Sequence, residues 1–375
     1  MSETERARAI HRRAITVDGH CDTPYRLHRH SVGLAAEDPS AQVDLDKLRR
    51  SGINASFFVS YVPSYYVGRG AYGFAEHLID LIQREIAANP ELLAAASAAD
   101  IRRAREENRI AILIGIEGGH AIEDSLEKLA KLYERGARYL TLTHVNNNNW
   151  ADSSGDAPLH GGLTPLGRQI VQRMNDLGML VDVSHVADST FSDVLATTRT
   201  PVIASHSSCR ALTTHPRNLT DEMLRDLAAN GGICMINFFS AFISQSVADC
   251  LRNAPKGDSK ESPVEPELEE LPNDRSHWNE YLEWWSSLDC PQATLDDVIA
   301  HIVHAVEVAG IDHVGIGTDF DGVPALPQGV TDASMFPAVT ERLLRHGFSD
   351  ADVLKILGEN FMRVFEAVEG GRTSV

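Results

Sequence analysis

Cysteine is scarce in this chain, which has five among its 375 residues. The five are odd in number and lack the spacing of a zinc finger. A reduced compartment is the simplest interpretation, so we expect the cysteines to stay reduced. They are Cys21, Cys209, Cys234, Cys250 and Cys290.

Basic residues are too few to balance the acidic ones. The chain has 34 Lys and Arg residues against 53 Asp and Glu residues, which gives a formal net charge of -19. Such an excess repels phosphate backbones and anionic lipid at long range, and no basic stripe offsets it. We therefore expect no nucleic-acid partner.

Long apolar runs are absent as well. No stretch is long and apolar enough to span a bilayer. Residues 1–8 mix charges and lead into no apolar segment of the kind that a signal peptide requires. The polar end, residues 369–375, is not an anchor signal. We expect a cytoplasmic protein with no membrane partner.

Apolar, β-branched runs recur along the chain with amphipathic stretches between them. The expected strands are 14–17, 53–59, 110–116, 139–143, 179–183, 201–204, 232–237 and 313–317, and the expected helices are 74–87, 126–135, 165–177, 220–229 and 295–308. Alternating strands and helices indicate a parallel sheet, and eight strands are the number that closes a barrel. The pattern predicts an α/β protein, a (β/α)8 TIM barrel, as one catalytic domain over 1–375.

Two segments near the C-terminus need their own interpretation. Residues 350–367 place apolar side chains on one side, as a closing helix would. About seventy residues separate the last two strands, far beyond an ordinary connection. We interpret 245–295, with its polar stretch 253–273, as an insertion over the barrel rim. Its residues Trp278, Trp284 and Trp285 are expected to fill a small local core rather than to touch substrate.

Candidate metal ligands stand at the ends of the apolar runs. His20 and Asp22 lie two positions apart, so a strand would point both side chains the same way. Glu117 ends an almost wholly apolar run, and a buried carboxylate calls for a cation or an arginine. Gly118 and Gly119 leave room for close approach, which favours a metal.

Two histidines extend this set. His185 and His206 each follow a serine at a strand end, and neutral imidazole is a preferred ligand of zinc. A lone histidine at such a place is more often a satisfied core residue, but two in successive strands reverse that expectation. One rim of a barrel would collect all of these side chains.

Four further residues are candidates for chemistry. His144, after the fourth run, is a candidate metal ligand, oxyanion donor or structural residue. Asp319 is a candidate ligand or general base. Asp321 competes with it, although Gly322 makes Asp321 look like a turn residue. Arg217 has the fork that suits a substrate carboxylate.

Six motifs together resemble the membrane (renal) dipeptidase family, peptidase family M19, within the amidohydrolase superfamily. They are Asp18-Gly-His-Cys-Asp22, Glu117-Gly-Gly-His120, Val183-Ser-His185, Ala204-Ser-His-Ser207, His215-Pro-Arg-Asn218 and Gly317-Thr-Asp-Phe-Asp-Gly322. The similarity runs from near residue 14 to near residue 366, in the family's order. The interval between the last two strands has no match to the family.

The resemblance implies that the barrel binds two divalent metal ions, and zinc is the expected metal. His20, Asp22 and Glu117 would hold one ion, and Glu117, His185 and His206 the other. It also assigns His144 to the substrate carbonyl, Arg217 to the C-terminal carboxylate and Asp319 to proton transfer. A homodimer is a further implication, because relatives are often dimeric.

The resulting hypothesis is a zinc-dependent dipeptidase. The ions would lower the pKa of a shared water, so that hydroxide attacks the peptide bond without a covalent intermediate. The resemblance alone suggests a tolerated D-residue at the C-terminal position. Two alternatives stay open: another amidohydrolase-type hydrolase, such as a lactonase, deaminase or phosphotriesterase, and a metal-binding barrel without turnover.

Overall fold

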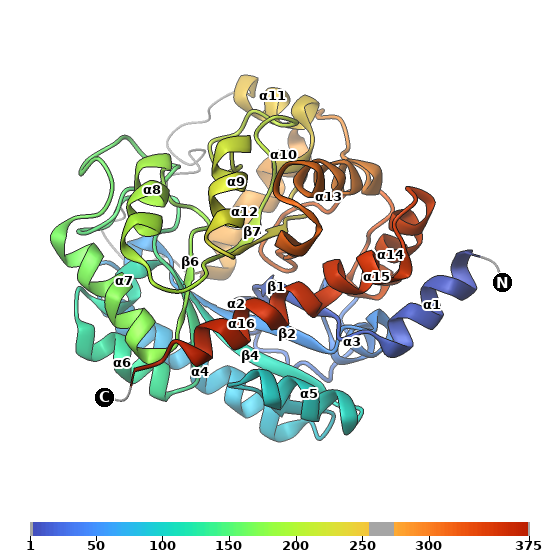
Figure 1. Ribbon diagram of the computed structural model, residues 1–375, viewed down its shortest axis with the longest axis horizontal. Coiled ribbons are helices and arrows are strands. Elements are labelled where there is room, and N and C mark those ends of the chain that lie inside the picture. The colour runs from blue at the N-terminus through green and yellow to red at the C-terminus, as the bar shows by residue number, and fades with distance from the viewer. Residues whose placement is uncertain (1–2, 255–273, 374–375) are drawn as a thin grey trace.

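A barrel of parallel strands forms the centre of the protein. The computed structural model describes residues 3–254 and 274–373 (Figure 1). Neighbouring strands follow the order β1-β2-β4-β5-β6-β7-β8-β9. These strands are β1 (Val17–Cys21), β2 (Ala55–Tyr61), β4 (Ile110–Glu117), β5 (Ala137–Thr141), β6 (Leu180–Asp182), β7 (Ile203–Ser207), β8 (Ile233–Ile236) and β9 (Val314–Ile316). A parallel bridge from Cys21 to Phe320 joins the chain after β9 to β1, which nearly closes the sheet.

The predicted (β/α)8 class is confirmed, and every expected run contributes a strand to the barrel. The first strand was placed too early, because β1 starts at Val17 and continues through polar residues to Cys21. A short additional strand, β3 (Leu92–Ala94), was not predicted. It pairs with the first part of β4, beginning at Ile110, whereas β5 pairs with β4 only from Ile114 onward.

Helices surround the strands, and the two chain ends lie on opposite sides of the molecule (Figure 1). The helices are α1 (Glu3–Arg13), α2 (Thr23–His30), α3 (Leu45–Ser51), α4 (Ala71–Ala88), α5 (Ala98–Glu106), α6 (Leu126–Glu134), α7 (Pro165–Leu177), α8 (Asp188–Thr197), α9 (Asp221–Ala229), α10 (Ser240–Ile243), α11 (Gln245–Asn253), α12 (Asp274–Ser287), α13 (Leu295–Ala309), α14 (Phe336–Arg345), α15 (Asp350–Leu354) and α16 (Asn360–Gly370). The bounds of α7 match the expectation because its caps are strong: the Thr164 side chain accepts from Gly167 N, and Gly178 follows in the left-handed region.

Both faces of the barrel strands are buried, so side chains that alternate along a strand enter two separate cores. The inner core contains Phe57, Leu113 and Met235, and the outer core contains their neighbours beneath the surrounding helices. Phe361 and Phe365 of α16 belong to the inner core. In Figure 1, α16 crosses in front of the strands. It therefore closes the N-terminal end of the barrel.

The segment expected as one closing helix is broken in two. Between α15 and α16 the residues Lys355–Glu359 form a wider turn with non-helical backbone at Gly358. The chain passes very close to the segment before β1 at this point, since a Cβ on Gly358 would lie 2.2 Å from the carbonyl oxygen of Ile15. Only glycine allows this approach, and the helix axis changes there.

The interval predicted as an insertion contains α11 and α12, while residues 255–273 lie outside the described residues. Cys250 and Cys290 form a disulfide that joins α11 to the segment after α12. The expectation of reduced cysteines is therefore wrong for this pair. Cys21, Cys209 and Cys234 are free and buried.

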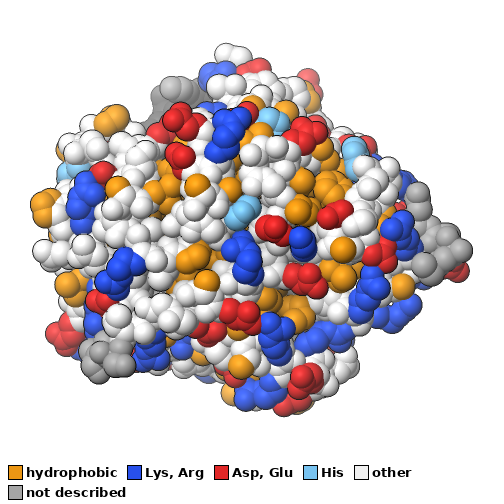
Figure 2. Space-filling model, in the orientation of Figure 1, with side chains coloured by type: hydrophobic (Ala, Val, Ile, Leu, Met, Phe, Trp, Pro, Cys, Tyr) orange, Lys and Arg blue, Asp and Glu red, His pale blue; other side chains and the backbone are white. Residues whose placement is uncertain are grey.

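The surface fits the charge pattern of the sequence. Figure 2 shows acidic and basic side chains interspersed over the face in view. Among the helices of 3–254 and 274–373, none combines the length and apolarity needed to cross a membrane.

Candidate metal and catalytic site

The strands bring five candidate ligands together around the carboxylate of Glu117. Its Oε2 lies 3.4 Å from His20 Nε2, which is also 3.4 Å from Asp22 Oδ2. Its Oε1 lies 3.0 Å from His185 Nε2 and 3.3 Å from His206 Nε2. One carboxylate thus faces two ligand sets, one with each oxygen.

The barrel positions these side chains at the C-terminal ends of its strands. His20 lies in β1, Glu117 is the last residue of β4, and His206 lies in β7. His185 and Asp319 follow their strands in the left-handed region, with φ of 69° and 63°. Such backbone costs on the order of 1–3 kcal/mol for a residue other than glycine, and it occurs mainly at functional sites.

Hydrogen bonds on the far side of two imidazoles orient them toward Glu117. Ser205 Oγ donates to Asp182 Oδ2 at 2.7 Å and lies 2.8 Å from His206 Nδ1. Because its hydrogen is used on the carboxylate, the serine accepts from Nδ1–H and leaves Nε2 with a lone pair. The Tyr139 hydroxyl lies 2.8 Å from His20 Nδ1 in the same manner. Such outer partners are usual for metal-binding histidines, although Nδ1 of His185 has none among the described residues.

Burial is the largest influence on the acid–base groups. It would lower the pKa of His20, but the charges of Glu117 and Asp22 outweigh it and raise that pKa well above its ordinary value. It would raise the pKa of Glu117, but the surrounding histidines hold that pKa well below its usual range. Burial lowers the pKa of His185 and of His206, which keeps both imidazoles neutral.

The donor set fits divalent cations. His185 Nε2 and His206 Nε2 lie only 2.9 Å apart beside a carboxylate oxygen, and such a cluster of lone pairs is repulsive without a cation or protons among them. Within the described residues, His20 Nε2 and Asp22 Oδ1 are buried without a hydrogen-bond partner. Imidazole nitrogen and carboxylate oxygen are ligands of zinc and related ions. Three groups of side chains lie close enough to hold an ion: His20–Glu117–His206, Glu117–His144–His185 and His20–Asp22–Asp319.

Asp319 adjoins this cluster, as predicted, and Asp321 does not. The Asn237 amide donates to Asp319 Oδ2 at 2.9 Å. Burial, together with the Asp22 and Glu117 charges, raises the pKa of Asp319 to about 8. Asp321 instead accepts from Arg26 Nε and from the Thr23 hydroxyl, which fixes the loop. The expectation of a structural role for Asp321 agrees with these contacts.

His144 lies beside His185, and Arg217 lies beside His206. The His144 ring centroid is 4.4 Å from that of His185 and 4.7 Å from that of Tyr61. Arg217 is 6% exposed and donates through Nη2 to His206 O at 3.0 Å. Its Nε is buried without a hydrogen-bond partner among the described residues. Burial lowers the pKa of Arg217 to about 10.

Several supporting residues escaped the sequence analysis. Asp182, Ser205 and Tyr139 act through neighbours that lie far away in the sequence or on another strand. A signal existed for Asn237, because it is a polar residue at the end of an apolar run, as the ligands are. Gly119 was interpreted as room for a metal, but a Cβ there would meet Leu142 O at 2.3 Å. Its small size serves packing.

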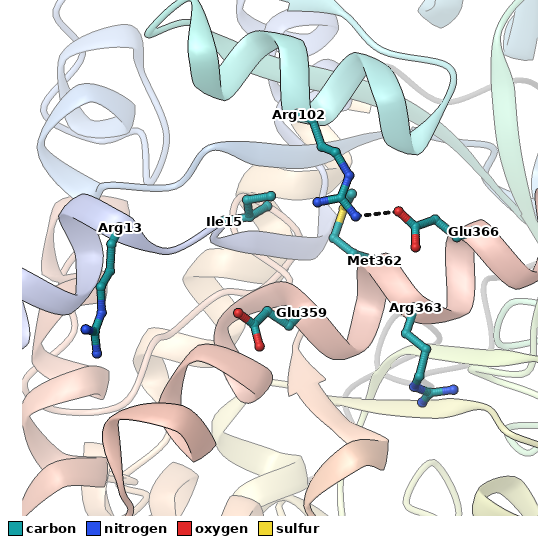
Figure 3. Close-up of a pocket in the computed structure, with 7 residues that line it drawn as sticks. All are labelled: Arg13, Ile15, Arg102, Glu359, Met362, Arg363 and Glu366. Carbon is teal, nitrogen blue, oxygen red and sulfur yellow. Dashed lines mark hydrogen bonds and ion pairs between the residues drawn. The ribbon is translucent and has the colours of Figure 1, made fainter.

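A hollow lies at the opposite end of the strands from the candidate ligands (Figure 3). Its volume is about 400 Å³, and Arg13, Arg102 and Arg363 line it. Arg102 pairs with Glu366, as the dashed line in Figure 3 shows, and Arg363 donates to the carbonyl oxygens of Gly231 and Asp312. Side chains at this end of a barrel ordinarily stabilise it, so the candidate chemistry lies at the other end.

Comparison with known proteins identifies relatives of the chain. The chain is 34% identical over 370 residues to dipeptidase verJ of Clonostachys rogersoniana, covering 94% of this chain and 84% of that protein. The structure of the probable dipeptidase PvdM from Pseudomonas aeruginosa matches with a TM-score of 0.83 at 28% identity, covering 98% of this chain and 99% of that one.

A fold relative from Rhodobacter sphaeroides, a metallo peptidase, was solved with a phosphinate mimic of the dipeptide L-Ala-D-Ala. It matches with a TM-score of 0.77 at 23% identity, covering 95% of this chain and 99% of that one. The family model described as membrane dipeptidase, peptidase family M19, matches residues 4–374. Since that match spans nearly the whole sequence, the chain belongs to the membrane dipeptidase family.

Proposed function

We propose that the protein hydrolyses dipeptides with two divalent metal ions, for which zinc is the expected metal. The observation that carries the proposal is the carboxylate of Glu117, whose two oxygens face two separate sets of ligands. The proposed ligands are His20, Asp22 and Glu117 for one ion, and Glu117, His185 and His206 for the other. Membership of the membrane dipeptidase family supports the substrate class.

The ions, when bound, supply Lewis-acid activation of a water molecule and of the scissile carbonyl. His144 donates a hydrogen bond to the carbonyl oxygen as negative charge develops on it. A pKa of about 8 leaves Asp319 mostly protonated without metal, and bound cations would favour its ionised form. The ionised carboxylate then accepts the proton of the attacking water and passes it to the leaving amine. Asn237 holds Asp319 Oδ2 at 2.9 Å and so fixes the orientation of that carboxyl group.

Arg217 sets the length of the substrate by binding its C-terminal carboxylate. The side chain is buried beside the ligand His206, and its Nε has no acceptor within the described residues, so a substrate anion would complete its hydrogen bonds. A longer peptide would place an amide where the carboxylate belongs. The dipeptide mimic held by the Rhodobacter sphaeroides structure supports a D-residue at this position.

A pair of substrates tests the role of Arg217. A dipeptide is expected to exceed its C-terminal amide in kcat/KM by roughly tenfold or more, because a hydrogen bond to a charged group is lost. The variant Arg217→Met should remove that preference. Arg199→Met is the control, since Arg199 is an exposed arginine that pairs with Asp176 at the surface. Equal rates for acid and amide in the unmodified enzyme would contradict the assignment.

Metal analysis tests the centre itself. Protein reconstituted with zinc should contain about two ions per chain, and chelation should abolish turnover of a dipeptide panel. No bound metal after reconstitution would contradict the site. Turnover of lactones or phosphotriesters without turnover of any dipeptide would instead favour another amidohydrolase-type reaction.

A further inference from the structure

Arg29, in α2, is a buried cation that forms no salt bridge with a carboxylate of the described residues. Its side chain belongs to a residue that is 6% exposed. Among the described residues, neither Nε nor Nη1 has a hydrogen-bond partner, and Nη2 reaches only Asp321 O at a long 3.5 Å. Burial is the main cause that lowers the pKa of Arg29.

Arg26, one turn earlier in the same helix, shows how a buried arginine is usually satisfied: each of its side-chain nitrogens has an acceptor. It donates through Nε to Asp321 at 3.0 Å, through Nη1 to Asp38 at 3.1 Å and through Nη2 to Val43 O at 2.8 Å. A buried donor without an acceptor costs on the order of 1–3 kcal/mol, more when it is charged. The contrast within one helix indicates that Arg29 serves something other than the fold.

The surroundings of Arg29 leave one edge of the guanidinium for a ligand. The Tyr25 ring lies 4.7 Å from Cζ, and the Trp278 ring of α12 lies 4.0 Å from it. Rings packed against a planar cation cover its faces, so the groups without partners, Nε–H and the Nη1 amino group, point outward in the plane of the guanidinium. Nη1 and Nη2 share the end edge of the guanidinium, where two parallel N–H groups match the two oxygens of a carboxylate, and Nη2 is held there only by the long contact to Asp321 O.

Arg29 also lies on the active-site rim. Helix α2 begins directly after the proposed ligand Asp22, and the negative charges of Asp321 and Asp22 act on the guanidinium. Arg217 follows β7, which is three strands from β1 when counted through the bridge that joins β1 to the chain after β9. Two arginines with unpartnered N–H groups thus stand at different sectors of the rim, each beside a different ligand set.

We propose that Arg29 binds the side-chain carboxylate of an acidic residue at the N-terminal position of the substrate. The proposal rests on the proposed dipeptidase function, in which Arg217 holds the C-terminal carboxylate. The first residue of the dipeptide then extends toward β1 and α2. The substrate class is a dipeptide that begins with aspartate or glutamate.

Access to Arg29 has the same requirement as access to the metal ligands. All five proposed ligands are less than 10% exposed, so any dipeptide must displace part of the cover to enter. Trp278 of α12 is the part of that cover that lies on Arg29. A neighbouring ring contact, between Phe239 after β8 and Trp285, holds the other end of α12 on the rim.

An isosteric substrate pair tests the proposal. Glu-Ala and Gln-Ala differ in one charge, and the zinc-reconstituted enzyme is expected to favour Glu-Ala by roughly tenfold or more in kcat/KM, mainly through KM. Arg29→Met keeps the apolar stem between the two rings but removes the donors, so the ratio should fall toward one. The control Arg199→Met removes an exposed arginine already paired with Asp176 and should keep the ratio.

The outcomes separate this proposal from the function on which it rests. Hydrolysis of Gln-Ala with no preference for Glu-Ala would overturn the role of Arg29 and leave the dipeptidase intact. No hydrolysis of any dipeptide would overturn the function. If Arg29→Met does not fold, the ratio in the unmodified enzyme still decides, because it needs no variant.

Discussion

Ser205 should control metal affinity without touching a metal ion. Its hydroxyl lies between Asp182 Oδ2 and His206 Nδ1, at 2.7 Å and 2.8 Å. The variant Ser205→Ala leaves Nδ1–H of a buried imidazole without its acceptor and allows the ring to rotate or change tautomer. Loss of such an outer partner weakens metal binding about ten- to a hundredfold. At 1.4 kcal/mol for each factor of ten, this is about 1.4–2.8 kcal/mol.

Competition for zinc with a chelator of known affinity measures the effect, independently of catalysis. Ser60→Ala is the matched control, because Ser60 is also a buried serine on a barrel strand but donates to Ala75 O in the helix layer. Both variants lose some stability, so the free energy of unfolding of the metal-free proteins is measured in parallel. Equal zinc affinity for Ser205→Ala and Ser60→Ala would refute the reasoning.

Three further predictions concern stability. Burial lowers the pKa of His11 from 6.5 to about 4, so the unfolded chain binds a proton at this residue at a higher pH than the folded chain does. The free energy of unfolding should therefore fall by about 3 kcal/mol as the pH drops from 7 to 4. Urea titrations at each pH measure this fall, and His11→Gln should make it smaller. The disulfide between Cys250 and Cys290 spans 40 residues, so Cys290→Ser should lower the free energy of unfolding by up to about 4 kcal/mol, and an unchanged melting temperature would contradict this. Phe361→Ala removes an inner-core ring and should cost about 3–5 kcal/mol in urea unfolding; a cost below 1 kcal/mol would show that α16 does not support the barrel.

The sequence predicted the barrel because its signals are local. Apolar β-branched runs and helix caps act within one element, as Thr164 and Gly178 do for α7. The end of β1 was missed because Asp18 lies inside the strand, where its carboxylate accepts from Thr318, about 300 residues away. A polar residue within a strand is satisfied by partners that a local pattern does not contain.

The candidate site divides in the same way. Residues at strand ends, such as His20 and Glu117, could be selected because parallel strands deliver their ends to one rim. The orienting contact from Ser205, the unpartnered state of Arg29 and the disulfide at Cys250 depend on distances between elements, so no local pattern reveals them. The assignment of metal and catalytic roles stays a prediction until the experiments above are done.

The position of α16 determines how the substrate and the products can enter and leave the barrel. Phe361 and Phe365 fill the inner core, so a small molecule cannot pass through the N-terminal end of the barrel. The substrate and both amino-acid products must then enter and leave through the C-terminal end of the barrel, beside α12. The products must therefore leave before the next substrate binds. Slow product release would limit turnover even where bond cleavage is fast.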